Sequence, residues 1–126
     1  MPLIKDHPRT RFILFFPPYS IFKFAIDSQT KPYLFSQYKE HVEKIINETR
    51  PYANAEVYWF NDKEFITDIA NYKDLGHYSA KYNSMFLEHF SSGKSIINTS
   101  NYKLLLNDFE RKANEVDLVT LAGKFM

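Results

Sequence analysis

Two short apolar runs on either side of a long amphipathic segment constrain the fold of this chain most strongly. The first run, Phe12–Phe16, contains only Phe, Ile and Leu and ends at Pro17-Pro18. Prolines lack the backbone N–H that a strand ladder needs, so a strand must stop there. The second run, Glu56–Phe60, is again aromatic or β-branched. We predict two strands, the first of them buried on both faces.

The segment between the two runs has the spacing of a helix. Pro32 stands near its start, Thr30 is a candidate N-cap, and Pro51 follows its end. The apolar positions that share one helical face are Leu34, Phe35, Tyr38, Val42, Ile45 and Ile46. A strand, a long helix and a strand with no hairpin-sized turn predict a right-handed βαβ crossover with adjacent parallel strands.

The second half of the chain predicts two more helices after an irregular region. Residues 61–78 are polar apart from a possible helical turn near Phe65-Ile66. Ser79 is expected to cap a helix that ends at Ser92-Gly93. Its apolar face is formed by Tyr82, Met85, Phe86, His89 and Phe90. A last helix begins near Ser100, with Leu105, Phe109, Ala113 and Val116 on one face and a mobile tail after Val119.

Composition excludes several classes of function. A chain of 126 residues with 44% hydrophobic residues has the size of one domain with one core. Sixteen basic and fifteen acidic residues leave too little positive charge for a nucleic-acid binder. The absence of Cys removes disulfides and thiolate chemistry. No signal peptide or membrane segment is recognisable, so the chain as written is expected in the cytoplasm.

The segment Asn71–Ser79 holds the strongest chemical signal. On a tight turn ending at Gly76, the carboxylate of Asp74 can accept the Nδ1 proton of His77 and leave Nε2 free as a base. Asp74 and His77 are therefore a candidate catalytic pair. The alternative is a loop Asp that makes a side-chain turn, followed by a His that lies near the next helix.

Four further residues are candidates for a pocket around this pair. Tyr72 and Tyr78 flank it in the sequence, although packing is the commoner use of Tyr in so Tyr-rich a chain. Tyr19 and Ser20 follow the first strand at the carboxyl edge of the sheet, where sites form in open α/β folds. Ser20 lacks the Gly neighbours of a nucleophile elbow, and a turn or cap role is more usual for such a serine.

Metal binding is not favoured by the histidines. His41, His77 and His89 form no HxH or HxxxH pair, and a closed site needs three or four converging ligands. His41 is expected to be exposed on a helix, and His89 to be half-buried. We predict neither a metal nor an organic cofactor.

The fold class predicted is α/β, with a short parallel sheet and flanking helices. Two parallel strands are too few to support helices on both faces, so we interpret residues 1–126 as one incomplete domain. The exposed edge of the sheet would then be covered by a missing N-terminal half, by another chain or by a second copy.

Phe15–Ser20, the strand Val57–Phe60 and Asn71–Ser79 together resemble the SGNH/GDSL hydrolases. The resemblance is to a bacterial branch that is often membrane-anchored and faces the periplasm. It spans most of the chain and implies the C-terminal half of a flavodoxin-like three-layer domain. It also implies that His77 is the general base of a serine ester hydrolase or acyltransferase and that Asp74 orients it.

The same resemblance implies that this chain lacks the nucleophile. The family's serine lies in a Gly-x-Ser block upstream of the aromatic strand, whereas the eleven residues before Phe12 contain neither Gly nor Ser. The oxyanion-hole Gly and Asn are not identifiable either. We therefore expect a cell-envelope esterase or acyltransferase fragment that acts on an ester or acylated glycan and is inactive alone. A non-catalytic interaction module is the alternative.

Overall fold

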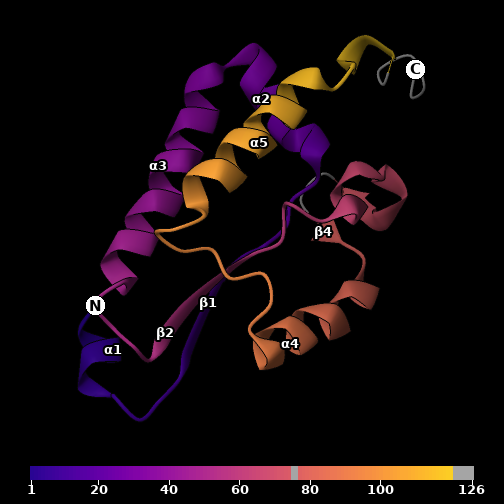
Figure 1. The fold of residues 1–126 in the computed structure, drawn as a ribbon. Helices are drawn as coiled ribbons and strands as arrows, with labels where there is room; N and C mark the ends of the chain where they lie inside the picture. Colours follow the sequence, from indigo (N-terminus) through magenta and orange to yellow (C-terminus); the bar gives the residue numbers. More distant parts are fainter. Residues whose placement is uncertain (75–76, 121–126) are drawn as a thin grey trace.

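The computed structural model describes residues 1–74 and 77–120 and has a mixed α/β architecture around two parallel strands (Figure 1). Strand β1 (Phe12–Phe16) pairs in parallel with β2 (Ala55–Trp59), so that Phe12 lies opposite Ala55 and Phe16 opposite Trp59. Both strands and their parallel pairing were predicted, β2 within one residue. The expected turn at Gly76 and nearly all of the tail after Val119 lie outside the described residues.

The crossover between the strands contains two helices rather than one. Helix α2 (Ile21–Thr30) was not predicted, and α3 (Pro32–Thr49) follows it after the single residue Lys31. Thr30 does not cap α3 as predicted, because it is the last residue of α2 and its hydroxyl donates to the carbonyl of Ile26. Pro32 begins α3 directly, where a missing N–H costs nothing.

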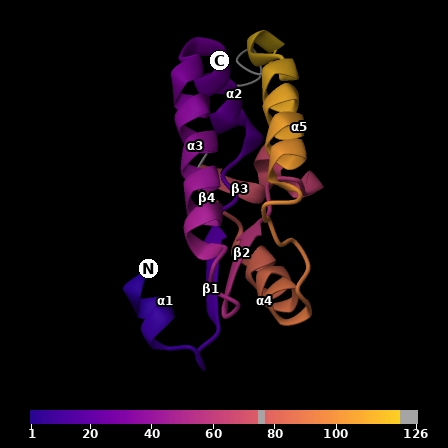
Figure 2. The same ribbon diagram turned by 60° about the vertical axis from the view of Figure 1, so that its left-hand side comes forward.

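Helices cover both faces of this two-stranded sheet (Figures 1 and 2). Helices α2, α3 and α5 (Tyr102–Glu115) lie on one face, and α4 (Asn83–Ser92) lies on the other. Val57 and Trp59 of β2 belong to the first core, whereas Tyr58 and the adjoining Phe60 belong to the second. The expectation that two strands are too few for this arrangement was wrong, because large β2 side chains fill both cores.

Strand β1 is not buried on both faces, contrary to the prediction. Leu14 and Phe16 pack against the helical core, but the side chains on the other face, Ile13 and Phe15, are 38% and 39% exposed. Phe15 reaches the α4 side only in part, with its ring centroid 5.4 Å from that of Phe90. Among the described residues, β2 is the only strand paired with β1, so its other edge is open.

Short elements connect the sheet to α4. They are the 3-10 turns η1 (Glu64–Thr67), η2 (Ile69–Asn71) and η3 (Ala80–Tyr82) and the antiparallel strands β3 (Tyr72–Asp74) and β4 (His77–Tyr78). The first turn confirms the helical turn predicted near Phe65, whereas the hairpin was not predicted. Ser79 precedes η3 and makes no side-chain cap bond, so the predicted capping of α4 was wrong. Gly93 ends α4 as expected, with φ 74°.

The two ends of the chain add the remaining helices. Helix α1 (Pro2–Asp6) was not predicted, and α5 begins at Tyr102, two residues after the expected Ser100. Leu106 is buried on α5 beside the predicted Phe109 and Ala113. Over residues 1–74 and 77–120, the helices are too short or too polar to cross a lipid bilayer.

A buried hydrogen bond joins β2 to the long helix α3. Trp59 is 1% exposed, and its indole Nε1 donates to the hydroxyl oxygen of Tyr38 over 2.7 Å. The indole ring also meets Phe109 of α5 edge-on, at a centroid separation of 5.5 Å. Burial raises the pKa of the Tyr38 phenol, which stays neutral. This bond gives the indole N–H its partner within an otherwise apolar core.

Tyr38→Phe should lower the free energy of unfolding by about 1–3 kcal/mol, because it leaves the buried Trp59 N–H without a partner. The control is Tyr33→Phe, which removes a hydroxyl from a residue of the same helix that is 58% exposed and should change little. Urea unfolding followed by Trp fluorescence measures both. Equal effects of the two variants would contradict the assigned role of this bond.

A polar network ties the beginning of β1 to β2 and α4. Arg11, just before β1, forms an ion pair with Glu56 and donates to the Tyr58 hydroxyl over 3.0 Å and to the Phe90 carbonyl. The Tyr58 hydroxyl donates to the second carboxylate oxygen of Glu56 over 3.1 Å. The hydrogen bond from Arg11 lowers the pKa of Glu56. The guanidinium of Arg11 therefore links the beginning of β1 to both β2 and α4.

Glu56→Gln should lower the free energy of unfolding by about 1 kcal/mol near pH 7. This is a small effect for a hydrogen-bonded charge, because water screens this site. Because the pKa of Glu56 is lower in the folded protein than in the unfolded chain, its charge stabilises the fold at pH values above the unfolded-state pKa. That stabilisation is lost as the pH falls through the folded-state pKa. The difference from wild type should therefore shrink below pH 4.5, the ordinary pKa of Glu. Urea unfolding from pH 3 to 7 measures it, with the more exposed Glu48→Gln as control. A difference that grows on acidification would contradict the prediction.

Candidate functional site

Asp74 and His77 are hydrogen-bonded across the β3–β4 hairpin. Asp74 is the last residue of β3 and His77 the first of β4, and the two are paired in the register of the hairpin. Both carboxylate oxygens of Asp74 lie 2.7 Å from Nδ1 of His77. A carboxylate only accepts, so Nδ1 carries the proton in this bond. Nε2 of a neutral imidazole is then the acceptor.

This pair lies at the molecular surface. The side chains of His77 and Asp74 are 76% and 57% exposed. Water therefore screens their attraction, and the bond sets the orientation of the imidazole more than it adds stability. The exposure also leaves the imidazole accessible to a group that approaches from outside.

The hairpin lies at the carboxyl edge of the parallel sheet, as the sequence predicts. The hydroxyl of Tyr72 on β3 donates to the carbonyl of Pro18, two residues beyond β1, over 2.8 Å. The side-chain amide of Asn61, two residues beyond β2, donates to the carbonyl of Tyr19 over 2.9 Å. These two bonds bring the exits of both strands and the hairpin together at one end of the sheet.

The four candidate pocket residues have packing and capping contacts. Tyr72 is buried, and Tyr78 is half-buried with its ring edge-on to Phe86 at 5.0 Å. Tyr19 is half-buried and its ring centroid lies 6.5 Å from that of Phe24. Ser20 is fully buried, and its hydroxyl oxygen accepts the backbone N–H of Phe22 as the N-cap of α2. The cap role suggested by the sequence is the one that Ser20 has.

Asn61 is a buried polar residue at this edge that the sequence interpretation missed. It is 2% exposed, and its Oδ1 has no hydrogen-bond partner in the described structure. Its Nδ2 holds the loop after β1, as described above. The signal for it in the sequence is a polar residue directly after a buried aromatic run.

The three candidate histidines, His41, His77 and His89, lie on three different elements of the fold. His41 is exposed on α3, with its ring centroid 5.9 Å from that of Phe16. His89 is half-buried on α4 beside Phe60, as predicted, and burial lowers its pKa. Within residues 1–74 and 77–120, no group of three or more His, Asp or Glu side chains has the geometry to hold a metal ion.

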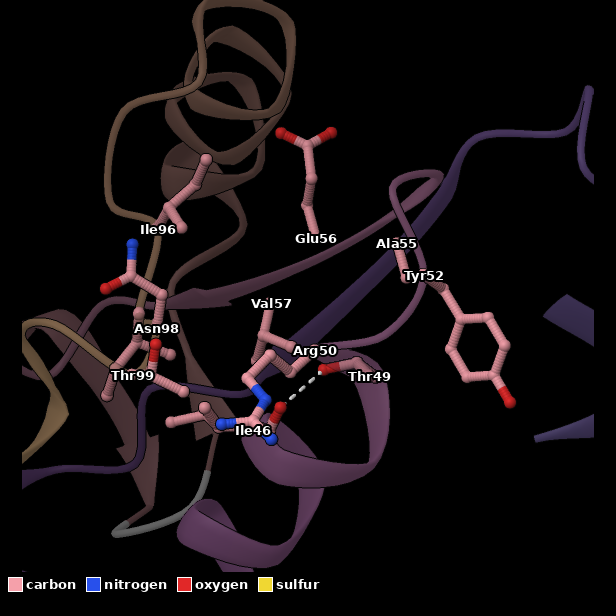
Figure 3. A pocket seen from close by; sticks show the side chains of 11 residues that line it. Ile46, Thr49, Arg50, Tyr52, Ala55, Glu56, Val57, Ile96, Asn98 and Thr99 are labelled. Atoms are coloured by element: carbon pink, nitrogen blue, oxygen red, sulfur yellow. Dashed lines mark hydrogen bonds between the residues drawn. The ribbon is translucent and has the colours of Figure 1, made fainter. Parts of the chain in front are cut away.

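A surface hollow of about 200 Å³ lies at the opposite end of the sheet (Figure 3). The end of α3, the beginning of β2 and residues 96–99 enclose it. The buried side chains of Ile46, Val57 and Ile97 form its apolar part. Because it adjoins the amino end of β2, this hollow is separate from the Asp74–His77 pair beyond the carboxyl end.

Comparisons with known proteins return no relatives: the chain matches no protein-family model, no curated protein and no solved structure.

Tyr72→Phe should lower the free energy of unfolding by about 1–2 kcal/mol, because the buried Pro18 carbonyl loses its donor. Faster hydrogen exchange should accompany it at the backbone N–H of Ser79, which donates to the Asn71 carbonyl over 2.7 Å beside the hairpin that this bond anchors. Tyr78→Phe is the matched control, because its hydroxyl makes no hydrogen bond in the described structure. Unchanged exchange in Tyr72→Phe would show that the hairpin is held by other contacts.

Proposed function

We propose that Asp74 and His77 are the orienting acid and general base of an SGNH-type ester hydrolase or acyltransferase. The observation that carries this proposal is the 2.7 Å contact between Nδ1 of His77 and the carboxylate of Asp74. This contact fixes the tautomer in which Nε2 can accept a proton from a serine hydroxyl. The position of the pair beyond the carboxyl ends of parallel strands supports the same proposal.

In this proposal the serine comes from outside the sequence described. Ser20, the serine nearest the first strand exit, is fully buried and engaged as a helix cap. The open edge of β1 offers a place for a further parallel strand, whose carboxyl end would lie beside the Asp74–His77 hairpin. A serine directly after such a strand would approach the exposed imidazole.

The chemistry would be acyl transfer from an ester or an acylated glycan. Nε2 of His77 would take the serine proton as the hydroxyl oxygen attacks the acyl carbon, and would return it to the leaving alcohol. Asp74 would stabilise the imidazolium formed between these steps. The proposed mechanism uses no metal or organic cofactor. Without the serine, the pair alone would not turn over substrate.

A second candidate function is a non-catalytic interaction module that docks through β1. The open edge of this strand and the partly exposed Ile13 and Phe15 favour it. The edge of such a strand presents backbone N–H and C=O groups with which a strand of another chain can pair. In this case Asp74 and His77 would serve only to hold the hairpin, and no hydrolysis would depend on them in any assembly.

The state of His77 tests the first proposal directly. Long-range ¹H–¹⁵N NMR correlations at pH 8 should show the neutral ring protonated at Nδ1, and Asp74→Ala should shift the population toward the Nε2–H form. Lys73→Ala is the control, because it changes the neighbouring residue without touching the pair. A ring protonated at Nε2 in the unmodified protein would overturn the assignment of His77 as base.

Hydrolysis assays test where the serine lies. With p-nitrophenyl acetate, His77→Ala and Asp74→Asn should hydrolyse ester at the same rate as the unmodified chain, because this pair has no serine to activate here. A rate that falls tenfold or more in His77→Ala would show that the nucleophile is within the chain and would overturn the proposal of an external serine.

A further inference from the structure

The loop after α4 places the hydroxyl of Ser95 beside the imidazole of His89. Nδ1 of His89 lies 2.6 Å from Oγ of Ser95, within hydrogen-bond distance. Both residues are only partly buried. We propose that Ser95 and His89 are a nucleophile–base pair that accepts acyl or phosphonyl groups from activated esters, separate from the Asp74–His77 site.

The backbone of Ser95 has the conformation of a strained residue. Its φ is 69°, and it is the only non-glycine residue with a positive φ among residues 1–74 and 77–120. A side chain in this region costs free energy that Gly or Asn largely avoids, and such strain gathers at functional sites. Two residues earlier stands Gly93, giving the order Gly93-Lys94-Ser95. A loop with only a linking role would gain stability from Gly at position 95.

Both partners are held by backbone hydrogen bonds. The carbonyl of Ser95 accepts the backbone N–H of Trp59 on β2 over 3.0 Å. The carbonyl of His89, in the last turn of α4, accepts the N–H groups of Gly93 and Lys94. The ring of His89 also lies against Phe60, with centroids 5.6 Å apart. Ser95 is thus fixed to the sheet and His89 to the end of a helix, and these attachments hold the hydroxyl and the imidazole in position relative to each other.

The surroundings favour the neutral, basic form of His89. Burial lowers its pKa, and the positive charges of Lys63 and Lys94 lower it further, against the opposing charges of Glu88 and Asp62. The lowered pKa therefore favours the neutral imidazole, the form that can accept a proton.

The reaction proposed is a simple displacement. In the tautomer protonated at Nε2, Nδ1 accepts the Ser95 proton as Oγ forms a bond to the electrophilic carbon or phosphorus. With p-nitrophenyl acetate, the ester C–O bond breaks and nitrophenolate leaves. With a fluorophosphonate, the P–F bond breaks and fluoride leaves. His89 then releases the proton to solvent, and Ser95 carries the acyl or phosphonyl group.

Labelling with a fluorophosphonate probe tests the proposal, read by intact mass and by the mass of the peptide that contains residue 95. One equivalent should add to Ser95. Ser95→Ala and Ser95→Gly should abolish that label, and the glycine variant should fold because it suits the positive φ. His89→Gln should slow labelling by about 10²-fold, the usual contribution of a general base. The matched control Ser92→Ala removes a neighbouring hydroxyl that donates to the Glu88 carbonyl, and labelling should persist.

The pH dependence separates a base from a structural neighbour. The midpoint of the fall in labelling rate on acidification should lie below pH 6.5, because burial holds the pKa of His89 under that ordinary value. The same fall should be absent in His89→Gln. No label on Ser95, or labelling equal in His89→Gln and the unmodified protein, would overturn the proposal. Neither result bears on Asp74 and His77, whose test is the tautomer of His77.

Discussion

Burial of strand β2 on both faces is the constraint on which the rest of the structure depends. Successive large side chains from Val57 to Phe60 point alternately into two separate cores, and each core needs its own helices. The indole of Trp59 adds a polar requirement that Tyr38 meets from α3. A strand with this composition cannot face water on either side, so even a two-stranded sheet is enclosed in three layers.

The candidate site depends on this strand only indirectly. The exits of β1 and β2 meet at one edge through Asn61 and the Tyr19 carbonyl, and Tyr72 attaches the hairpin to the same edge. Asp74 and His77 are thereby positioned by buried contacts while they remain in water themselves. A site of this kind has its orientation set in advance and its electrostatics weakened by solvent, and an enclosing partner would strengthen them.

The sequence predicted the elements that have a strong and simple pattern. Phe12–Phe16 and the run around Trp59 are short, apolar and bounded by breakers, and the spacing through Val42 and Ile46 is helical. Helix α2 was not predicted, although Ile21, Phe24, Ala25 and Ser28 are its buried residues. The exposed face of β1 was missed because an apolar run does not reveal how many neighbours will cover it.

Among the candidate site residues, contacts within a short stretch of chain were predictable and contacts that depend on tertiary structure were not. The Asp74–His77 bond was predictable because both residues lie within one turn of chain, where spacing determines whether they meet. The Ser20 cap was equally local. The contact between His89 and Ser95 depends on a helix end and on the attachment of the next loop to Trp59, which no short-range pattern encodes.

The connection between α2 and α3 is the single residue Lys31, and this has a consequence for the order of folding. Helices α2 and α3 are neighbours in sequence and their aromatic faces meet, with the rings of Phe24 and Phe35 5.8 Å apart. They can collapse through local contacts, whereas β1 and β2 are separated by the whole crossover and must close a long loop before they pair. Contacts between α2 and α3 shorten the loop that must close. We therefore expect the two parallel strands to pair after these helices have formed.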